Sequence, residues 1–337
     1  MRGLWWLLAL AILVTGSAGT YMVHLVLEAK QKPRIGDGSN PATYGFSFEH
    51  LTVPMNEIQA SGLPRNSLDV LDLPPRYSAE EATHFRGRDK YVVATDLILG
   101  VELGDEALAY PIQILNWHEV VNDTLAGVPI VVSYSPLTGT IAAFDRRVGD
   151  QTLEFGFSGL LLETHSLLFD RSDEPSLWSP LLGRAISGPA AARGDTLRPI
   201  HAQFVPWSVW SKRHPEAEVL TRDEAKIMAY RRSPYGEYYG NDILRFPVSK
   251  LPPDRETYPY KSRIIAVRTT GDWSVYHLAD LVRRADPRGI YETTQDGVDL
   301  RFTVFSGDPI TAYVEAVDPT DWFDFRPTMW FAWYSVH

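Results

Sequence analysis

The residues best suited to chemistry lie between positions 116 and 139. Asn-Trp-His-Glu at 116–119 places an imidazole beside a carboxylate, and a β-type apolar run then leads to the turn Ser-Pro-Leu-Thr-Gly at 135–139. A histidine that is oriented by a carboxylate can serve as a general base or as a metal ligand. The alternative for His118 is a buried ring that is hydrogen-bonded to the backbone. Of the whole chain, only this stretch combines titratable side chains, a predicted strand and a tight turn.

Two further residues join the candidates. His165 follows Thr164 beside an apolar run and could converge with His118, whereas the alternative is a surface histidine. Asp145 begins an Asp-Arg-Arg run at the end of a predicted strand, where a structural ion pair is the default and an anion contact the alternative. We therefore take His118, Glu119 and Asp145 as candidate catalytic residues, and His118 and His165 as candidate metal ligands.

None of the strong enzyme templates is complete. His118-Glu119 lacks the second histidine that a zinc protease helix needs, because Asn122 stands in its place. Gly-Phe-Ser-Gly at 156–159 lacks the glycine that a nucleophile elbow requires, because Leu160 stands there. No phosphate loop or dinucleotide fingerprint occurs in the right context. We therefore expect no cofactor and favour a protein that is not an enzyme.

Composition excludes several classes of function. The 337 residues include 32 Lys and Arg against 42 Asp and Glu, and this net charge of −10 opposes binding to a nucleic-acid backbone. The chain contains no cysteine, which excludes disulfides, thiolate metal sites and thiol nucleophiles. Hydrophobic residues make up 45% of the chain, as expected for a folded protein with a sizeable core.

The first thirty residues predict a membrane segment. Residues 4–27 are apolar except for a patch of small residues at 15–19 and His24. This pattern is compatible with a cleaved signal peptide, or with one helix of about 36 Å that crosses the bilayer with some tilt. We favour the second alternative because the apolar run resumes after the small patch. With Arg2 inside, the protein would be a single-pass inner-membrane protein with its bulk in the periplasm.

The rest of the chain predicts a mainly β (α+β) protein. Short runs of β-branched and aromatic residues alternate with turn residues, which favours an antiparallel β-rich domain. We expect an extended run over 91–101, another over 108–114 and a helix over 275–283. The predicted parts are a signal-anchor (1–28), a Pro/Gly-rich tether (29–75), a first half (76–225), a connector (226–260) and a second, shorter half (261–337).

The two halves share a sequence pattern. Trp-x-x-Trp-x-x-x-His occurs at 207–214 and again at 330–337, and both segments are expected to be short helices. Tyr110 and Tyr276 precede comparable hairpins in the two halves. The pattern predicts an internal duplication in which only the first copy carries His118 and Glu119.

Several motifs together resemble a known family. The motifs are Ala-Tyr-Pro at 109–111, Asn-Trp-His-Glu-Val-Val-Asn-Asp at 116–123, Phe-Asp-Arg at 144–146, Phe-Gly-x-Ser-Gly at 155–159, Ser-Leu-Trp at 176–178 and Trp-Phe-Ala-Trp at 330–333. They resemble the prokaryotic family catalogued as domain of unknown function 3179 (DUF3179), over roughly residues 74–337. Members look like exported or membrane-attached proteins, and the resemblance implies no established activity.

One departure from the family decides our expectation of function. Family members usually have Tyr-Cys-Pro-Leu-Cys where this chain has Tyr-Ser-Pro-Leu-Thr at 134–138. A pair of thiols on a turn suits soft-metal binding or redox exchange, for which Ser135 and Thr138 are poor substitutes. The resemblance thus implies a family site that has lost its sulfur ligands.

We therefore expect a non-catalytic, membrane-anchored accessory or scaffold subunit of an integral-membrane complex, such as an electron-transport complex. Its partners would be the membrane, through residues 4–27, and other subunits of that complex, with no nucleic acid. One alternative is a metal-binding protein or enzyme that uses His118 and Glu119. Another is a solute-binding module with an aromatic cleft.

Overall fold

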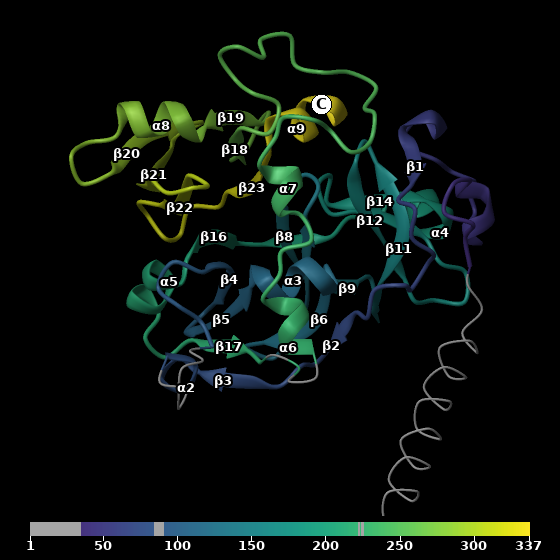
Figure 1. Ribbon diagram of the computed structural model, residues 1–337, viewed down its shortest axis with the longest axis horizontal. Helices are drawn as coiled ribbons and strands as arrows, with labels where there is room; N and C mark the ends of the chain where they lie inside the picture. The colour runs from purple at the N-terminus through teal and green to yellow at the C-terminus, as the bar shows by residue number, and fades with distance from the viewer. Residues whose placement is uncertain (1–34, 84–90, 222, 224–225) are drawn as a thin grey trace, which may run out of the picture. The chain divides into compact units, whose positions relative to one another are not determined.

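The computed structural model describes residues 35–83, 91–221, 223 and 226–337 (Figure 1). Strands dominate this part of the chain and form five sheets, in which most neighbouring strands are antiparallel. The prediction of a mainly β, α+β fold is therefore confirmed.

The largest sheet contains strands from both predicted halves. Its order is β20-β21-β22-β16-β4-β5-β17-β3. The two predicted halves meet where β16 pairs with β22. The strands are β3 (Arg76–Ser78), β4 (Leu97–Leu103), β5 (Glu106–Pro111), β16 (Ala202–Pro206), β17 (Glu218–Leu220), β20 (Ile290–Gln295), β21 (Val298–Phe305) and β22 (Thr311–Ala316). Inward residues alternate with outward ones along β21, as expected for a sheet with one buried face.

A second sheet lies inside the protein. It consists, in spatial order, of β15 (Arg198–Ile200), β8 (Thr140–Asp145), β7 (Val128–Ser135), β6 (Val120–Leu125) and β2 (Leu71–Asp72). Alternate residues of β7 enter different cores: Ile130 and Val132 pack with residues of β4 and β5, whereas Val131 packs with Phe155. Both faces of β7 and β8 are therefore buried, which explains their nearly continuous apolar sequence.

A third sheet covers the second face of β7 and β8. It consists of β1 (Ile58–Ala60), β11 (Phe155–Leu162), β12 (His165–Asp170), β13 (Leu177–Ser179) and β14 (Arg184–Ser187), in that order. Leu168 and Trp178 of this sheet pack in one cluster with Phe144 of β8. Side chains on this face of β7 and β8 therefore meet those of β11 and β12.

The remaining elements are small. They are the three-stranded sheet β19-β18-β23, the hairpin β9-β10 and short helices. Their bounds are β9 (Arg147–Val148), β10 (Gln151–Thr152), β18 (Arg263–Arg268), β19 (Ser274–His277), β23 (Asp324–Met329), η1 (Pro41–Tyr44), η2 (Met55–Glu57), α2 (Ala79–Thr83), α3 (Ile112–His118), α4 (Gly188–Arg193), α5 (Trp207–Arg213), α6 (Ile227–Tyr230), α7 (Gly236–Tyr239), α8 (Leu278–Arg284) and α9 (Trp330–Val336).

Some element boundaries differ from the predictions. The first extended run begins only at Leu97, because Asp96 accepts a hydrogen bond from the Val93 N–H and closes a turn. The next run ends at Pro111, after which α3 begins. Ile112 and Leu115 lie three residues apart, so the same apolar residues that suggested a strand pack one face of a helix. The helix predicted from position 275 begins at Leu278.

Part of the segment predicted to be a tether (29–75) packs against the third sheet, and β2 within it joins the second sheet. Tyr44 and Phe46 are buried, and β1 pairs with β11. Contacts divide the chain into Met1–Ile35 and one compact unit, Gly36–His337. The predicted anchor, residues 4–27, lies outside the described residues. Within the described ranges, no helix is long and apolar enough to cross a membrane.

Candidate functional site

Ser135 and Thr138 lie at the tip of the β7–β8 hairpin and are fully buried. Ser135 pairs with Thr140 across the hairpin, on the face that is covered by β11 and β12. Alternation along the two strands therefore directs these hydroxyls into the protein. Polar side chains meet at the place where the family resemblance implies paired thiols.

A chain of hydrogen bonds connects Ser135 with Glu119. The Ser135 hydroxyl donates to Ser166 Oγ (3.3 Å) and accepts from the Ser166 backbone N–H (3.1 Å). Ser166 Oγ lies 2.8 Å from Glu119 Oε2, to which it donates. One candidate hydroxyl is thus joined to the candidate carboxylate through Ser166, a residue that sequence reasoning missed although it follows His165 directly.

Glu119 is a buried carboxyl in a strained backbone position. It follows the last residue of α3 with a φ of 57°, a region that residues other than glycine seldom adopt. Its side chain accepts a second hydrogen bond, from Tyr235. Burial raises the pKa of Glu119 to about 7, although hydrogen bonds from Ser166 and Tyr235 act in the opposite direction. Glu119 therefore changes its charge near neutral pH.

Thr138 belongs to a second branch of hydrogen bonds, which contains His165. Nε2 of His165 accepts from the Leu181 backbone N–H (3.0 Å), so Nδ1 of the neutral ring carries the proton and donates to Thr138 Oγ1 (3.3 Å). Thr138 Oγ1 also lies 2.9 Å from Thr140 Oγ1, which lies 2.7 Å from Thr328 Oγ1 of β23. Three threonine hydroxyls thus connect the turn with the second half of the chain.

His165 is neutral in this network. Its side chain is buried, and burial lowers its pKa to about 3. A neutral imidazole binds a metal through its one unprotonated nitrogen, and in His165 that nitrogen already accepts from Leu181. The geometry therefore gives His165 a structural role.

Tyrosines of the connector close the site from outside. The Tyr238 hydroxyl donates to Leu137 O (2.7 Å), and the Tyr239 hydroxyl donates to Pro136 O (2.7 Å). Figure 1 shows the connector, in green, passing in front of β8 and α3. The tyrosine content of this segment was visible in the sequence, but no local pattern indicated that its side chains turn inward.

Arg263 holds the same turn from β18. Its Nη1 donates to Gly139 O (2.8 Å). Gly139 has a φ of 60°, and a Cβ at this position would collide with the Arg263 guanidinium. Glycine is thus required both by the backbone conformation and by the close approach of Arg263.

Replacing Gly139 by alanine should therefore destabilise the protein by roughly 2–3 kcal/mol, of which about 1 comes from the left-handed backbone. Gly104→Ala is the matched control, because Gly104 has a φ of 61° and nothing lies within 4 Å of a Cβ there. Chemical denaturation should show a larger loss for Gly139→Ala than for Gly104→Ala. Equal losses would contradict the role of Arg263.

His118 does not join this cluster, although it is the neighbour of Glu119. Its Nδ1 donates to Asp69 O, and its Nε2 accepts from the Tyr230 hydroxyl (2.8 Å) on α6. Burial lowers the pKa of His118. The two candidates that are adjacent in sequence therefore serve separate sets of hydrogen bonds.

Asp145 also lies outside the cluster, at the end of β8. It accepts hydrogen bonds from Arg147 and Arg198. Burial acts to raise the pKa of Asp145, but the bonds from the two arginines outweigh it and lower the pKa to about 2. The carboxylate is thus an ion-pair partner, which was the default alternative in the sequence.

The donor set of the cluster does not fit a soft metal ion. Ser135 and Thr138 present neutral hydroxyls, which bind soft metals poorly. The unprotonated nitrogen of His165 already accepts a hydrogen bond from Leu181. Over the described ranges of the chain, no group of three His, Asp or Glu side chains is placed to hold a metal ion. The arrangement can hold the turn rigid and exchange a proton at Glu119.

Comparison with known families agrees with the motifs that surround this cluster. The model of the family described as "Protein of unknown function (DUF3179)" matches residues 72–316, which include Glu119, the turn at 135–139 and His165. Comparison with curated proteins gave no match, and comparison with solved structures gave none. Because the family model matches well over half of the chain, the protein belongs to the DUF3179 family.

Proposed function

We propose that the chain is a non-catalytic member of its family that acts through its surface, as a membrane-anchored, extracytoplasmic accessory or scaffold subunit of a membrane complex. The observation that supports this most is the closed cluster at Ser135 and Thr138. Both side chains are 0% exposed, and both hydroxyls are hydrogen-bonded within the protein. Polar groups without access for a substrate serve the fold rather than a reaction.

We also infer an internal duplication. The strand orders β16-β4-β5 and β23-β18-β19 correspond. In each set a seven-residue helix follows the second strand of the hairpin, α3 after β5 and α8 after β19. Another seven-residue helix follows the third strand, α5 after β16 and α9 after β23. In α5 and α9 the second tryptophan contacts the histidine that ends the shared pattern, with ring centroids 4.2 Å apart for Trp210 and His214 and 3.8 Å apart for Trp333 and His337. Such a duplication would have left Glu119 in the first copy only.

The connector offers the surface that we assign to a partner. Ile243 is 75% exposed and Met228 is 62% exposed, whereas the tyrosines of the same segment cover the turn. Ile243 is the most exposed of the large apolar side chains in the described part of the chain, and we take it and Met228 as candidate anchors for a partner. A partner would therefore contact the outer side of the connector.

Purification of the tagged chain from membranes in mild detergent tests this proposal. A partner should co-purify, and Ile243→Asp combined with Met228→Asp should abolish its recovery because an aspartate would be desolvated in an apolar interface. Trp322→Asp is the matched control, since Trp322 is 55% exposed on a loop outside the connector. Recovery of the free chain alone, or equal loss in the control, would overturn the proposal.

The rival proposal is a metal-binding protein or an enzyme that uses His118 and Glu119. Elemental analysis of protein purified without added metal separates the two proposals. Stoichiometric metal that is lost in His118→Ala would favour the rival. A solute-binding module is a further candidate, supported by a large pocket whose lining includes five arginines and the ring of Trp273.

A further inference from the structure

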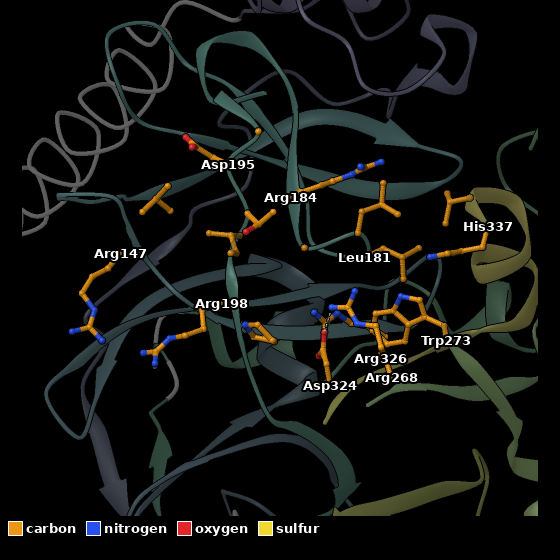
Figure 2. Close-up of a pocket in the computed structure, with 18 of the residues that line it drawn as sticks. Arg147, Leu181, Arg184, Asp195, Arg198, Arg268, Trp273, Asp324, Arg326 and His337 are labelled. Atoms are coloured by element: carbon orange, nitrogen blue, oxygen red, sulfur yellow. Dashed lines mark hydrogen bonds and ion pairs between the residues drawn. The ribbon is translucent and has the colours of Figure 1, made fainter. Parts of the chain in front are cut away.

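A pocket of about 860 Å³ lies between the inner sheet, the third sheet and the three-stranded sheet (Figure 2). Residues of β9, β14, β15, β18 and β23 line it. Its charged side chains are five arginines and two aspartates: Arg147, Arg184, Arg198, Arg268, Arg326, Asp195 and Asp324. The pocket does not include Ser135, Thr138 or His165.

The aspartates do not neutralise the arginines. Asp195 is paired with Arg193 (2.7 Å), which does not line the pocket. Asp324 is shared between Arg326 and Arg268, the latter at 3.5 Å. Arg184 forms no ion pair with any residue that the structure describes. The lining side chains therefore carry an excess of positive charge.

Two of these guanidinium groups have unused donors inside the protein. Arg326 is 4% exposed, and its Nη1 donates to Asp324 and to Phe325 O (2.8 Å). Its Nε, like the Nε of Arg268, is buried and finds no acceptor among the described residues. A buried charged donor without a partner is costly, so an acceptor supplied by a ligand would remove a penalty as well as add a bond.

The arginines are held in place from behind. Asp145 fixes Arg147 and Arg198, and the ring of Trp273 lies beneath Arg268 (4.8 Å) and Arg326 (5.8 Å). These contacts limit the rotamers of long side chains before any ligand arrives, which lowers the entropy lost on binding. The arrangement is that of a preformed site.

We propose that this pocket binds a small soluble molecule that carries two or more phosphate groups. The arginines come from five strands and lie at separate places around the pocket, so a ligand that meets several of them needs oxygens in several directions; phosphate groups offer these, whereas one guanidinium fork suffices for a planar carboxylate. Figure 2 shows Arg147 and Arg198 on one side and Arg268 and Arg326 on the other. Positive charge at both ends of the pocket requires a ligand with more than one anionic group.

Isothermal titration of the full chain with pyrophosphate at low ionic strength tests this proposal. Wild-type protein should bind pyrophosphate with one-to-one stoichiometry and at least tenfold more tightly than inorganic phosphate or citrate. Arg184→Gln should weaken binding at least tenfold, because it removes a cation that has no competing partner among the described side chains. Arg184 is exposed, so the variant should fold.

Arg232→Gln is the matched control, because Arg232 is an exposed arginine that does not line the pocket. It should change the affinity less than twofold. Equal losses in both variants would mean non-specific attraction, and the absence of pyrophosphate binding to the wild-type protein would also overturn the proposal. Vesicles of phosphatidylcholine with and without phosphatidic acid form a separate arm: recruitment that depends on Arg184, without pyrophosphate binding, would assign the pocket to a lipid headgroup instead.

Discussion

Replacing Glu119 by glutamine should stabilise the protein relative to the wild type as the pH rises from about 4.5 to about 7. In the folded protein burial raises the pKa of Glu119 to about 7, whereas a free glutamate titrates near 4.5. Between these values the folded state holds a proton that the unfolded state has released. The stability of the wild type therefore falls with increasing pH across this window, and it stays lower above it.

The expected size of this effect is large. The interval between the two pKa values corresponds to roughly 3 kcal/mol at 25 °C. Glutamine keeps the shape and can accept hydrogen bonds from Ser166 and Tyr235, but it has no charge to bury. Urea denaturation in a pH series should therefore give a difference in unfolding free energy, variant minus wild type, that grows by about this amount up to pH 7.

Glu174→Gln provides the control, because Glu174 is an exposed glutamate and its replacement causes the same change in net charge. Its difference from the wild type should stay nearly constant over the series. If Glu119→Gln behaves like this control, Glu119 is not a buried carboxyl with a raised pKa.

Sequence patterns located the cluster because its residues lie in or directly beside strands that form short hairpins. Ser135 and Thr138 stood out by comparison with the family, and Glu119 and His165 stood out as titratable residues beside apolar runs. Pairing of β7 with β8 and of β11 with β12 forms two hairpins, and packing of their sheets face to face brings the residues together. Such pairing between strands that are close in sequence can be anticipated from short turns.

The rest of the cluster depends on long-range contacts. Thr328 lies 188 positions beyond Thr140 in the sequence, and Arg263 reaches Gly139 from the second half. Tyr235 comes from a proline-rich connector whose local pattern predicts only irregular structure. No local propensity specifies which distant segment covers a turn, so these partners could not be predicted.

His118 and Glu119 do not share a site, although they are neighbours in the sequence, and the reason is geometric. Helix α3 ends at His118, and Glu119 directly after it adopts a positive φ. The reversal of the backbone separates the two side chains, so that His118 faces Tyr230 and Glu119 faces Ser166. Sequence neighbours share a site only when the backbone between them keeps a regular direction.

Replacing His165 by glutamine should have the opposite dependence on pH. Burial lowers the pKa of His165 to about 3, whereas a free imidazole titrates near 6.5. Between these values the unfolded state binds a proton that the folded state does not, so the wild type loses stability as the pH falls. The interval corresponds to roughly 4–5 kcal/mol. Glutamine offers a donor to Thr138 and an acceptor to Leu181 without taking up a proton.

At pH 7 the variant should be less stable than the wild type by about 1–3 kcal/mol, because glutamine fills the buried site imperfectly. On acidification the two unfolding free energies should converge and then cross, while the exposed His50→Gln control keeps a constant difference. A difference for His165→Gln that is independent of pH would show that the ring is not held neutral by burial. Between pH 4.5 and 6.5 the contributions of Glu119 and His165 have opposite signs, so each partly conceals the other in the wild type. Glu119→Gln should therefore show the full pH dependence of stability that His165 causes, and His165→Gln should show that of Glu119.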